Sequence, residues 1–332
     1  MNAIEFGDCR DTMRRWAQQG VKAQMCVTSP PYFGLRDYGH PGQIGLEQTP
    51  EEYVAKMVEV FRCVRDVLAD DGTLWLNIGD SYARTGGTDC KVSETAQVGS
   101  TRNTLEQMGD RTQSAAAIGL KPKDLIGIPW MLAFALRADG WYLRQDIIWA
   151  KPNPMPESVR DRCTKAHEYM FLLSKSERYF FDSEAMQESA SGREPGNRSH
   201  KHSDRVAREV AEGNHRERTK LGLASMGPRE TRNRRSVWTV ATRPYKGAHF
   251  ATFPPALIEP CILAGSRPGD IVLDPFIGSG TTAAVAIQHG RQYLGCELNP
   301  EYKPLQDERI ADAEAELVNV DTTLDLFSEV AA

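Results

Sequence analysis

The first half of the chain alternates apolar runs with stretches of helical periodicity. An apolar run at residues 25–27 ends at the Thr-Ser-Pro-Pro sequence of residues 28–31, which predicts a strand followed by a loop. The sequence Thr-Pro-Glu-Glu at residues 49–52 combines an N-cap residue, a proline at the first helical position and a glutamate three residues after the cap. Residues 71–72, Asp-Gly, are expected to end this helix before a buried strand at 73–78. The apolar positions of the helix are Val54, Met57, Val58, Phe61 and Leu68.

The same alternation returns later in the chain. Short apolar runs and longer stretches of helical periodicity are again separated by Gly and Pro. We expect a helix at 129–138, strands at 145–149 and 167–173, a strand at 271–273, a helix at 281–289 and a strand at 291–296. Strands that alternate with helices predict an α/β sheet with helices on its faces.

Two long stretches interrupt this pattern. Residues 84–117 are rich in Gly, Ser, Thr and Gln and too long for a simple connection, so we expect them to be mobile. Residues 191–235 hold twelve Lys and Arg against six acids, about +6 in a chain whose net charge is −5. We interpret the second stretch as an inserted subdomain or a disordered excursion. Its local charge is compatible with nucleic-acid binding despite the acidic chain, and a solvated surface loop is the alternative.

The composition is that of an ordinary globular protein, with 40% hydrophobic, 26% charged and 8% aromatic residues among 332. No run approaches the ~18 apolar residues of a membrane helix, and the first residues lack the features of a signal peptide. The seven cysteines are spread out without a C-x-x-C pair, so neither a disulfide framework nor a zinc site is expected. We expect a protein of the reducing cytoplasm that holds no metal.

A strand, a glycine-containing loop, a helix and a second strand follow one another at residues 271–297. The glycines of the loop let the backbone approach a ligand, and the helix start offers free N–H groups. Glu297, which ends the second strand, can accept hydrogen bonds from a ribose diol, so the unit is typical of nucleoside binding. Residues 278–283 also fit the G-x-G-x-x-[GA] pattern of nicotinamide dehydrogenases, whereas no Gly-Lys-Ser/Thr follows to make a P-loop. A plain glycine turn is the remaining alternative.

Residues 28–32, Thr-Ser-Pro-Pro-Tyr, are expected at the end of a strand. Two prolines make this corner rigid, and the Ser29 hydroxyl and Pro30 carbonyl are expected to face outward as acceptors beside the Tyr32 ring. Such a corner can hold a planar amine, because two acceptors bind its N–H groups while the ring stacks on the heterocycle. Taken alone, the same residues also fit a proline turn.

Together and in this order, the two motifs resemble the DNA amino-methyltransferases, which transfer the methyl group of S-adenosyl-L-methionine to N6 of adenine or N4 of cytosine. The box at 28–32 is similar to the catalytic loop of that family, and residues 249–254 and 274–282 are similar to its cofactor-binding block. The catalytic box precedes the basic stretch and the cofactor block follows it, as in the circularly permuted β group. The resemblance implies an α/β, Rossmann-like S-adenosylmethionine-dependent methyltransferase fold with an inserted target-recognition region.

The resemblance also assigns roles to individual residues. Ser29, Pro30, Pro31 and Tyr32 would be catalytic. Asp8 would lie near the cofactor adenine, and Glu297 would hold the ribose. The other cofactor-binding candidates are Thr28, Phe253, Asp274, Pro275, Phe276, Gly278, Ser279, Gly280, Thr281 and Thr282. The DNA-binding candidates are Lys151, Arg193, Arg198, Lys201, Arg205, Arg232, Arg234 and Arg235.

The chemistry requires orientation more than activation, because the exocyclic amine is a poor nucleophile and the sulfonium methyl a strong electrophile. Acceptance of the amino hydrogens by Ser29 and Pro30 would expose the nitrogen lone pair for in-line displacement. Tyr32 would stack on the base, which must leave the duplex. Many family members have Asp at the position of Ser29, and Ser is more typical of cytosine-N4 enzymes. Cytosine-N4 is therefore favoured, and adenine-N6 stays open.

We expect one α/β domain whose catalytic part (1–183) and cofactor-binding part (241–310) flank a target-recognition insertion (184–240), with a tail at 311–332. Double-stranded DNA is the expected partner, in the cytoplasm at the nucleoid and in a restriction-modification context, and the β-group resemblance implies a homodimer. In the tail, Leu324-Asp325-Leu326-Phe327 resembles the peptide with which bacterial proteins dock on the replication sliding clamp. A disordered or packed tail is the alternative.

Two other functions fit part of the sequence. An NAD-dependent oxidoreductase would use the glycine loop but would leave residues 28–32 and the basic stretch without a role. A catalytically silent DNA-binding protein would keep the fold, and the intact Ser29, Pro30, Tyr32 and Glu297 argue against it.

Overall fold

The computed structural model describes residues 1–35, 39–40, 42–83, 115, 118–189, 231–242 and 253–330, with side chains up to residue 318. The chain forms two compact units, one of Met1–Asp182 with Ser236–Ala332 and one of Ser183–Arg235. Nearly all of the 84–117 stretch and residues 191–230 of the basic stretch lie outside the described residues.

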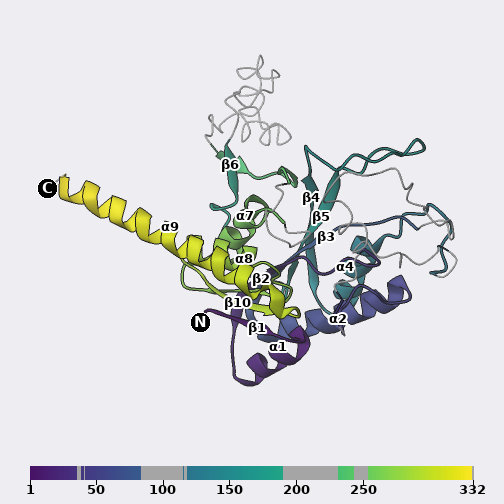
Figure 1. The fold of residues 1–332 in the computed structure, drawn as a ribbon, viewed down its shortest axis with the longest axis horizontal. Coiled ribbons are helices and arrows are strands. Elements are labelled where there is room, and N and C mark those ends of the chain that lie inside the picture. The colour runs from purple at the N-terminus through teal and green to yellow at the C-terminus, as the bar shows by residue number, and fades with distance from the viewer. Residues whose placement is uncertain are drawn as a thin grey trace, which may run out of the picture. The chain divides into compact units, whose positions relative to one another are not determined.

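The larger unit is built on a mixed sheet of eight strands within the described residues, in the order β1-β10-β9-β2-β3-β5-β4-β8 (Figure 1). β5 runs antiparallel to both of its neighbours, β3 and β4, and all other neighbouring pairs are parallel. The strands are β1 (Ala3–Phe6), β2 (Ala23–Thr28), β3 (Leu68–Ile78), β4 (Tyr142–Ala150), β5 (His167–Ser174), β8 (Val237–Thr239), β9 (Ile271–Asp274) and β10 (Gln292–Glu297).

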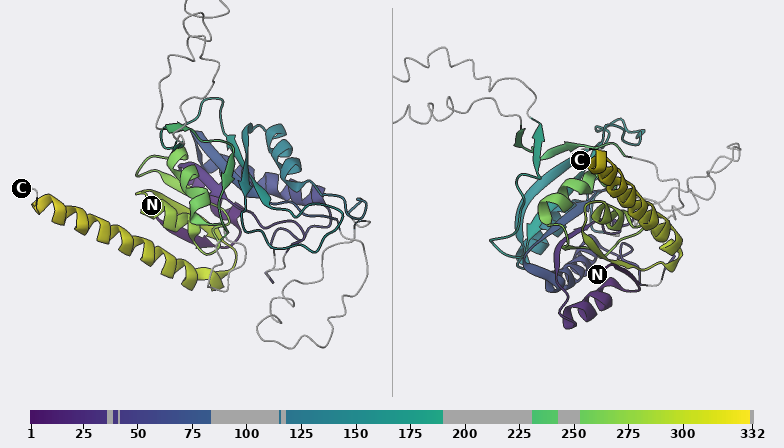
Figure 2. Two further views of the ribbon diagram at one scale, coloured as in Figure 1. Left: turned by 90° about the horizontal axis from the view of Figure 1, so that it is seen from above. Right: turned by 90° about the vertical axis from the view of Figure 1, so that its left-hand side faces the viewer.

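Helices cover both faces of this sheet (Figure 2). Leu74 and Leu76 of β3 join the core under α1, α2 and α4, whereas Trp75, between them, faces Gly265 of α7. This alternation is the two-residue period of a strand buried on both faces. The helices are α1 (Cys9–Gln18), α2 (Pro50–Val67), α4 (Ile128–Ala138), α7 (Pro255–Gly265), α8 (Thr281–Gln288) and α9 (Lys303–Val330), with a 3₁₀ turn, η2, at Pro300–Tyr302. The predicted α/β architecture is therefore confirmed.

Helix α2 begins as predicted and ends earlier than predicted. Thr49 Oγ1 accepts the backbone N–H of Glu52 at 3.2 Å, which is the expected N-cap. The helix ends at Val67 rather than at Asp71-Gly72, because the buried Leu68 already adopts an extended conformation and starts β3. Asp71-Gly72 lies instead where the pairing of β2 with β3 shifts register, between the pairs of Ala23 and Met25.

The smaller unit contains an antiparallel pair of short strands among its described residues. β6 (Gln187–Ser189) pairs with β7 (Thr231–Asn233), and Glu188 lies opposite Arg232. The Glu188 carboxylate accepts hydrogen bonds from Arg232 Nε at 2.8 Å and from Arg235 Nε at 3.0 Å. One acid therefore binds two of the expected DNA-binding arginines.

None of the described helices is long and apolar enough to cross a membrane. The described part of the chain contains no cluster of three or more His, Cys, Asp and Glu side chains suited to a metal ion. The described cysteines are all free thiols, of which only Cys163 is exposed.

Candidate active site

Four loops meet at one edge of the sheet. Since β1, β10, β9 and β2 run parallel, their carboxyl ends lie at the same edge, where α/β proteins bind ligands. The loops that follow these strands, together with Phe253 just before α7, line one pocket. The lining includes Gly7, Asp8, Ser29, Pro30, Pro31, Tyr32, Leu35, His40, Phe253, Pro275, Phe276, Gly278, Ser279, Thr281, Glu297 and Tyr302. The structure thus brings the predicted catalytic box and most of the predicted cofactor-binding residues into a single pocket.

The corner at residues 29–32 is held from behind by hydrogen bonds. Tyr53 of α2 donates through its hydroxyl to the Pro31 carbonyl at 2.9 Å. Ser29 Oγ donates to Tyr32 Oη at 3.5 Å, and Tyr32 Oη in turn donates to Glu168 at 2.7 Å. The prolines remove backbone freedom and these bonds hold the side chains, so the corner is preorganised.

The buried carboxylate of Asp274 joins the catalytic strand to the cofactor loop. Thr28 Oγ1 and Thr282 Oγ1 each donate to one of its two oxygens, both at 2.6 Å. The backbone N–H of Phe276 donates to Oδ1 at 3.0 Å. Burial raises the pKa of Asp274 to about 6, although all three hydrogen bonds oppose this rise. Thr28, Asp274 and Thr282 satisfy one another and support the pocket wall.

Glu297 lies at the end of β10 and faces the pocket. Its Oε2 accepts the backbone N–H of Gly278 at 3.0 Å, and its Oε1 accepts that of Asn299 at 2.8 Å. Burial raises the pKa of Glu297 to about 7, and the hydrogen bonds from backbone N–H groups oppose this rise. Burying an ionised carboxylate costs free energy, and additional hydrogen-bond donors, such as the hydroxyls of a ribose, would offset part of this cost.

Asp8 also lines the pocket, but it already has a strong partner. It caps α1 by accepting the backbone N–H of Arg10 at 2.8 Å, and it binds the Arg10 guanidinium at 2.6 Å. These hydrogen bonds lower the pKa of Asp8 below its ordinary value, so the carboxylate stays ionised. The Asp8 side chain, which is predicted to lie near the cofactor adenine, is therefore held in place by Arg10.

Helix α9 holds the glycine loop from outside. Gln306 Nε2 donates to the Gly278 carbonyl at 2.6 Å, and the Gln306 side chain is buried. Arg309 donates to Ser279 Oγ at 3.0 Å and also to Thr281 Oγ1. Gly280, which precedes α8, has a positive φ of 83°, a conformation that glycine adopts at little cost. Three contacts from α9 thus fix the loop that opens α8.

The described DNA-binding candidates already have contacts within their own units. Lys151 pairs with Glu168 and lies 4.2 Å above the centre of the Trp149 ring. Arg232 and Arg235, in the smaller unit, share Glu188, and Arg234 donates its backbone N–H to the Met186 carbonyl at 3.2 Å. Arg193, Arg198, Lys201 and Arg205 lie outside the described residues.

Comparison with known proteins identifies the family. Residues 23–308 match the family model of the N6/N4 methyltransferases, which is described as DNA methylase. The chain belongs to this DNA methylase family. The match covers both sequence motifs and the basic stretch between them, and it excludes the nicotinamide oxidoreductase. S-adenosyl-L-methionine is the methyl donor of the family, as the resemblance implied.

Several relatives resemble this DNA methylase over nearly their whole length. The type II methyltransferase M.XycI of Xanthomonas campestris pv. cyanopsidis is 46% identical over 95% of this chain and 89% of its own. M.SmaI of Serratia marcescens, also a type II methyltransferase, is 47% identical over 92% of this chain and 90% of its own.

Two solved structures share the fold of this DNA methylase. The PvuII DNA methyltransferase, a cytosine-N4-specific enzyme, superposes with a TM-score of 0.57 at 18% identity, over 96% of this chain and 93% of its own. A DNA modification methylase of Thermus thermophilus, solved with S-adenosyl-L-methionine, gives a TM-score of 0.55 at 22% identity over 94% of each chain. The Rossmann-like methyltransferase fold is therefore confirmed.

The pocket of this DNA methylase suits a nucleoside that carries a charged amino acid chain. Glu297 and Asp8 offer carboxylates, Phe253 and Phe276 offer apolar walls, and Gly278 brings bare backbone to the surface. Acids recognise the hydroxyls of a ribose and an ammonium, aromatic faces recognise an adenine, and a glycine lets the ligand approach the backbone closely. The residues present fit S-adenosyl-L-methionine.

Several residues that shape the site carry no sequence motif. Glu168, Gln306 and Arg309 reach the catalytic corner or the glycine loop from β5 and α9. Leu35 and His40 line the pocket from the loop that follows the catalytic box. The hydrogen bonds of Glu168, Gln306 and Arg309 join segments that are distant in the sequence. The sequence pointed to none of these roles: Glu168 was expected only as part of a strand at 167–173.

Proposed function

We propose that this DNA methylase transfers a methyl group to N4 of a cytosine that has left the DNA duplex, within a specific DNA sequence. One observation carries the proposal: Ser29, Pro30 and Tyr32 line the same pocket as Gly278 and Glu297. The groups that would hold an amine and those that would hold the methyl donor therefore face a common space. Adenine-N6 is the second candidate, because the same acceptors suit either exocyclic amine.

The residues of the chain orient the amine. The Ser29 hydroxyl and the Pro30 carbonyl accept hydrogen bonds from the two N–H groups of the amine. These hydrogen bonds turn the nitrogen lone pair toward the methyl group. They also place two acceptors beside the nitrogen, where positive charge develops. S-adenosyl-L-methionine supplies an electrophilic methyl group on a sulfonium. Glu297 holds the ribose and Tyr32 stacks on the base. Because the amine is paired and shielded inside a duplex, the base must be extruded, which costs a few kcal/mol.

Two features favour cytosine over adenine. Ser29 stands where many amino-methyltransferases have Asp, and Ser is more typical of the cytosine-N4 enzymes. The PvuII enzyme, whose fold this chain shares, is cytosine-N4-specific. The proposal therefore assigns the pocket to cytosine.

The proposal extends to the rest of the chain. Residues 184–240 serve as the target-recognition insertion, with the basic side chains of 191–235 on the phosphates, between the two parts of the catalytic domain at 1–183 and 241–310. Double-stranded DNA in the cytoplasm is the substrate. A homodimer remains a prediction. So does clamp docking by residues 324–327, which lie in the distal part of helix α9.

Nucleoside analysis tests the target base. The full chain is expressed in a bacterium that lacks DNA methylation, the genomic DNA is digested to nucleosides, and both methylated bases are measured by mass spectrometry. We expect N4-methylcytosine, at a strongly reduced level in cells that carry the Ser29→Ala variant. N6-methyladenine instead would move the proposal to its second candidate. Neither base, from a folded protein that binds S-adenosyl-L-methionine, would refute both.

A further inference from the structure

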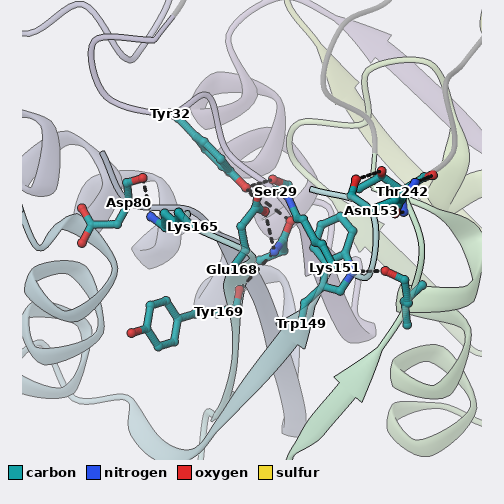
Figure 3. A network of polar contacts seen from close by, with 12 residues as sticks. Ser29, Tyr32, Asp80, Trp149, Lys151, Asn153, Lys165, Glu168, Tyr169 and Thr242 are labelled. Atoms are coloured by element: carbon teal, nitrogen blue, oxygen red, sulfur yellow. Dashed lines mark hydrogen bonds and ion pairs between the residues drawn. The ribbon is translucent and has the colours of Figure 1, made fainter. Parts of the chain in front are cut away.

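The carboxylate of Glu168 lies beside the Tyr32 hydroxyl and is not part of the pocket lining. Tyr32 Oη donates to Glu168 Oε2 at 2.7 Å, and Asn77 Nδ2 donates to the same oxygen at 3.3 Å. Lys151 Nζ forms an ion pair with the other oxygen, Oε1. Figure 3 shows Glu168 between Tyr32 and Lys151. Both oxygens of this carboxylate are therefore occupied by donors from other segments.

The reversed direction of β5 places Glu168 at this point. Tyr169 pairs with Ile78 at the end of β3, and Glu168 pairs with Trp149 near the end of β4. The amino end of β5 thus lies at the edge where its neighbours have their carboxyl ends. A glutamate 136 residues from Tyr32 in sequence can therefore reach the tyrosine hydroxyl.

The Tyr32 ring is also confined by bare backbone. A Cβ atom on Gly79, just after β3, would lie 2.7 Å from Tyr32 Cε2 and 3.3 Å from Glu168 Cδ. The absence of a side chain at Gly79 lets the ring approach the strand end. Burial and the Glu168 charge raise the pKa of Tyr32 well above its ordinary value, so its hydroxyl remains a donor. The Tyr32 ring is therefore confined at one edge by Gly79 and held at its hydroxyl by Glu168.

The ion pair makes the anchor strong. The side chains of Lys151 and Glu168 are 18% and 17% exposed, so water screens their attraction less than at an open surface. A hydroxyl that donates to an ionised carboxylate forms a shorter and stronger hydrogen bond than one that donates to a neutral oxygen. Lys151 also contacts the Trp149 face, so its ammonium has two partners inside the protein.

We propose that Glu168, held by Lys151, is a positioning residue: its carboxylate fixes the Tyr32 hydroxyl and so sets the plane of the ring on which the target base stacks. This inference rests on the proposed function, because it takes Tyr32 as the residue that stacks on the base. It also changes the predicted role of Lys151, which acts here through Glu168 rather than on a DNA phosphate.

A double-mutant cycle on the full-length protein tests the coupling. Glu168→Gln keeps the size of the side chain but removes its charge, and Tyr32→Phe keeps the ring but removes the hydroxyl. We expect kcat on unmethylated genomic DNA to fall about tenfold in each variant, with KM for DNA changed by less than about twofold. The double variant should lose about the same tenfold, because both changes remove one interaction. Losses that multiply to about a hundredfold would overturn the inference, as would an unchanged kcat in Glu168→Gln.

Lys151 provides the second test. Lys151→Met should lower kcat as Glu168→Gln does, with the salt dependence of DNA affinity unchanged, and Lys151→Arg should restore most of the rate because it keeps the charge. If Lys151 instead bound a phosphate, Lys151→Met would raise KM for DNA and reduce the magnitude of the salt slope by about one. That result would overturn its role in positioning.

Failure of the proposed function and failure of the positioning role give different results. Affinity for S-adenosyl-L-methionine serves as the control for folding, because neither Glu168 nor Lys151 lines the cofactor pocket. A wild-type protein that methylates no DNA base refutes the proposed function. An active wild-type protein whose Glu168 and Lys151 variants keep its kcat refutes only the positioning role.

Discussion

At Glu297, burial disfavours the ionised carboxylate that the proposed binding of a ribose requires. Its carboxyl group receives two backbone N–H groups, yet burial raises its pKa from 4.5 to about 7. Since the pKa in the folded state lies above that in the unfolded state, the protonated group adds stability below about pH 4.5, and this stability is lost as the pH rises through 7. Near neutral pH the site therefore holds a partly ionised acceptor at a cost in folding free energy.

The pH dependence of a neutral variant measures this cost. Glu297→Gln should gain stability relative to wild type as the pH is raised from 5 to 8, by at most about 3 kcal/mol, because the amide never ionises. Thermal unfolding of both proteins at the two pH values, without cofactor, gives the difference. The variant should also bind S-adenosyl-L-methionine more weakly at pH 8. A stability difference that is the same at both pH values would contradict the raised pKa.

Ser29 and Tyr32 should affect turnover far more than cofactor affinity. Both line the pocket, but neither belongs to the glycine loop or to the strand end that carries Glu297. Ser29→Ala and Tyr32→Ala should each lower kcat by about a hundredfold or more, because an acceptor or a stacking surface for the base is lost. Calorimetry with S-adenosyl-L-methionine should give a dissociation constant close to that of wild type. Equal losses of turnover and cofactor affinity would indicate a folding defect or a wrong assignment.

Individual elements were predictable wherever their signal is local. The cap at Thr49 and the glycine turn before Thr281 follow from neighbouring residues, and both are present. The end of α2 was not predictable, because Leu68 leaves the helix to pair with β2 in the sheet. The contacts of α9 were also hidden, since Gln306 meets Gly278 only after the chain has folded. Interactions within an element are encoded locally, whereas those between elements depend on packing.

Helix α9 should therefore influence cofactor binding through the loop that it holds. Gln306→Ala removes the donor to the Gly278 carbonyl, at a cost of about 1 kcal/mol, so affinity for S-adenosyl-L-methionine should fall about fivefold. Glu308→Ala changes an exposed side chain of the same helix and is the matched control. Calorimetry on both variants separates the hydrogen bond from a general effect on the helix. Equal affinities would mean that the loop keeps its shape without Gln306.

At the scale of the whole molecule, the distribution of charge matters more than its sum. The chain has a net charge of −5, yet residues 191–235 carry about +6. The permuted methyltransferase fold could be predicted from the sequence, because the order of the catalytic box and the cofactor-binding block along the chain is visible without a structure. The partners of single charges were not predictable: Arg232 and Arg235 share Glu188, and Lys151 pairs with Glu168. Positive charge that is already paired within the protein has less to gain from a phosphate.

Salt dependence of DNA affinity tests how the basic stretch is used. Each phosphate contact contributes about −0.9 to the slope of log affinity against log salt, so affinity should fall steeply between about 50 and 200 mM. Replacing Arg193, Arg198, Lys201 and Arg205 by Ala should reduce the magnitude of the slope by about three to four. The double replacement of Arg232 and Arg235 by Ala should reduce it by less than about two, because Glu188 already binds both side chains.

Fluorescence anisotropy on one DNA duplex, with wild type and both variants, gives all three slopes. A flat response in wild type would mean that the basic stretch does not contact phosphates. A full reduction of about 1.8 in the double variant would mean that DNA displaces Glu188 from its arginines.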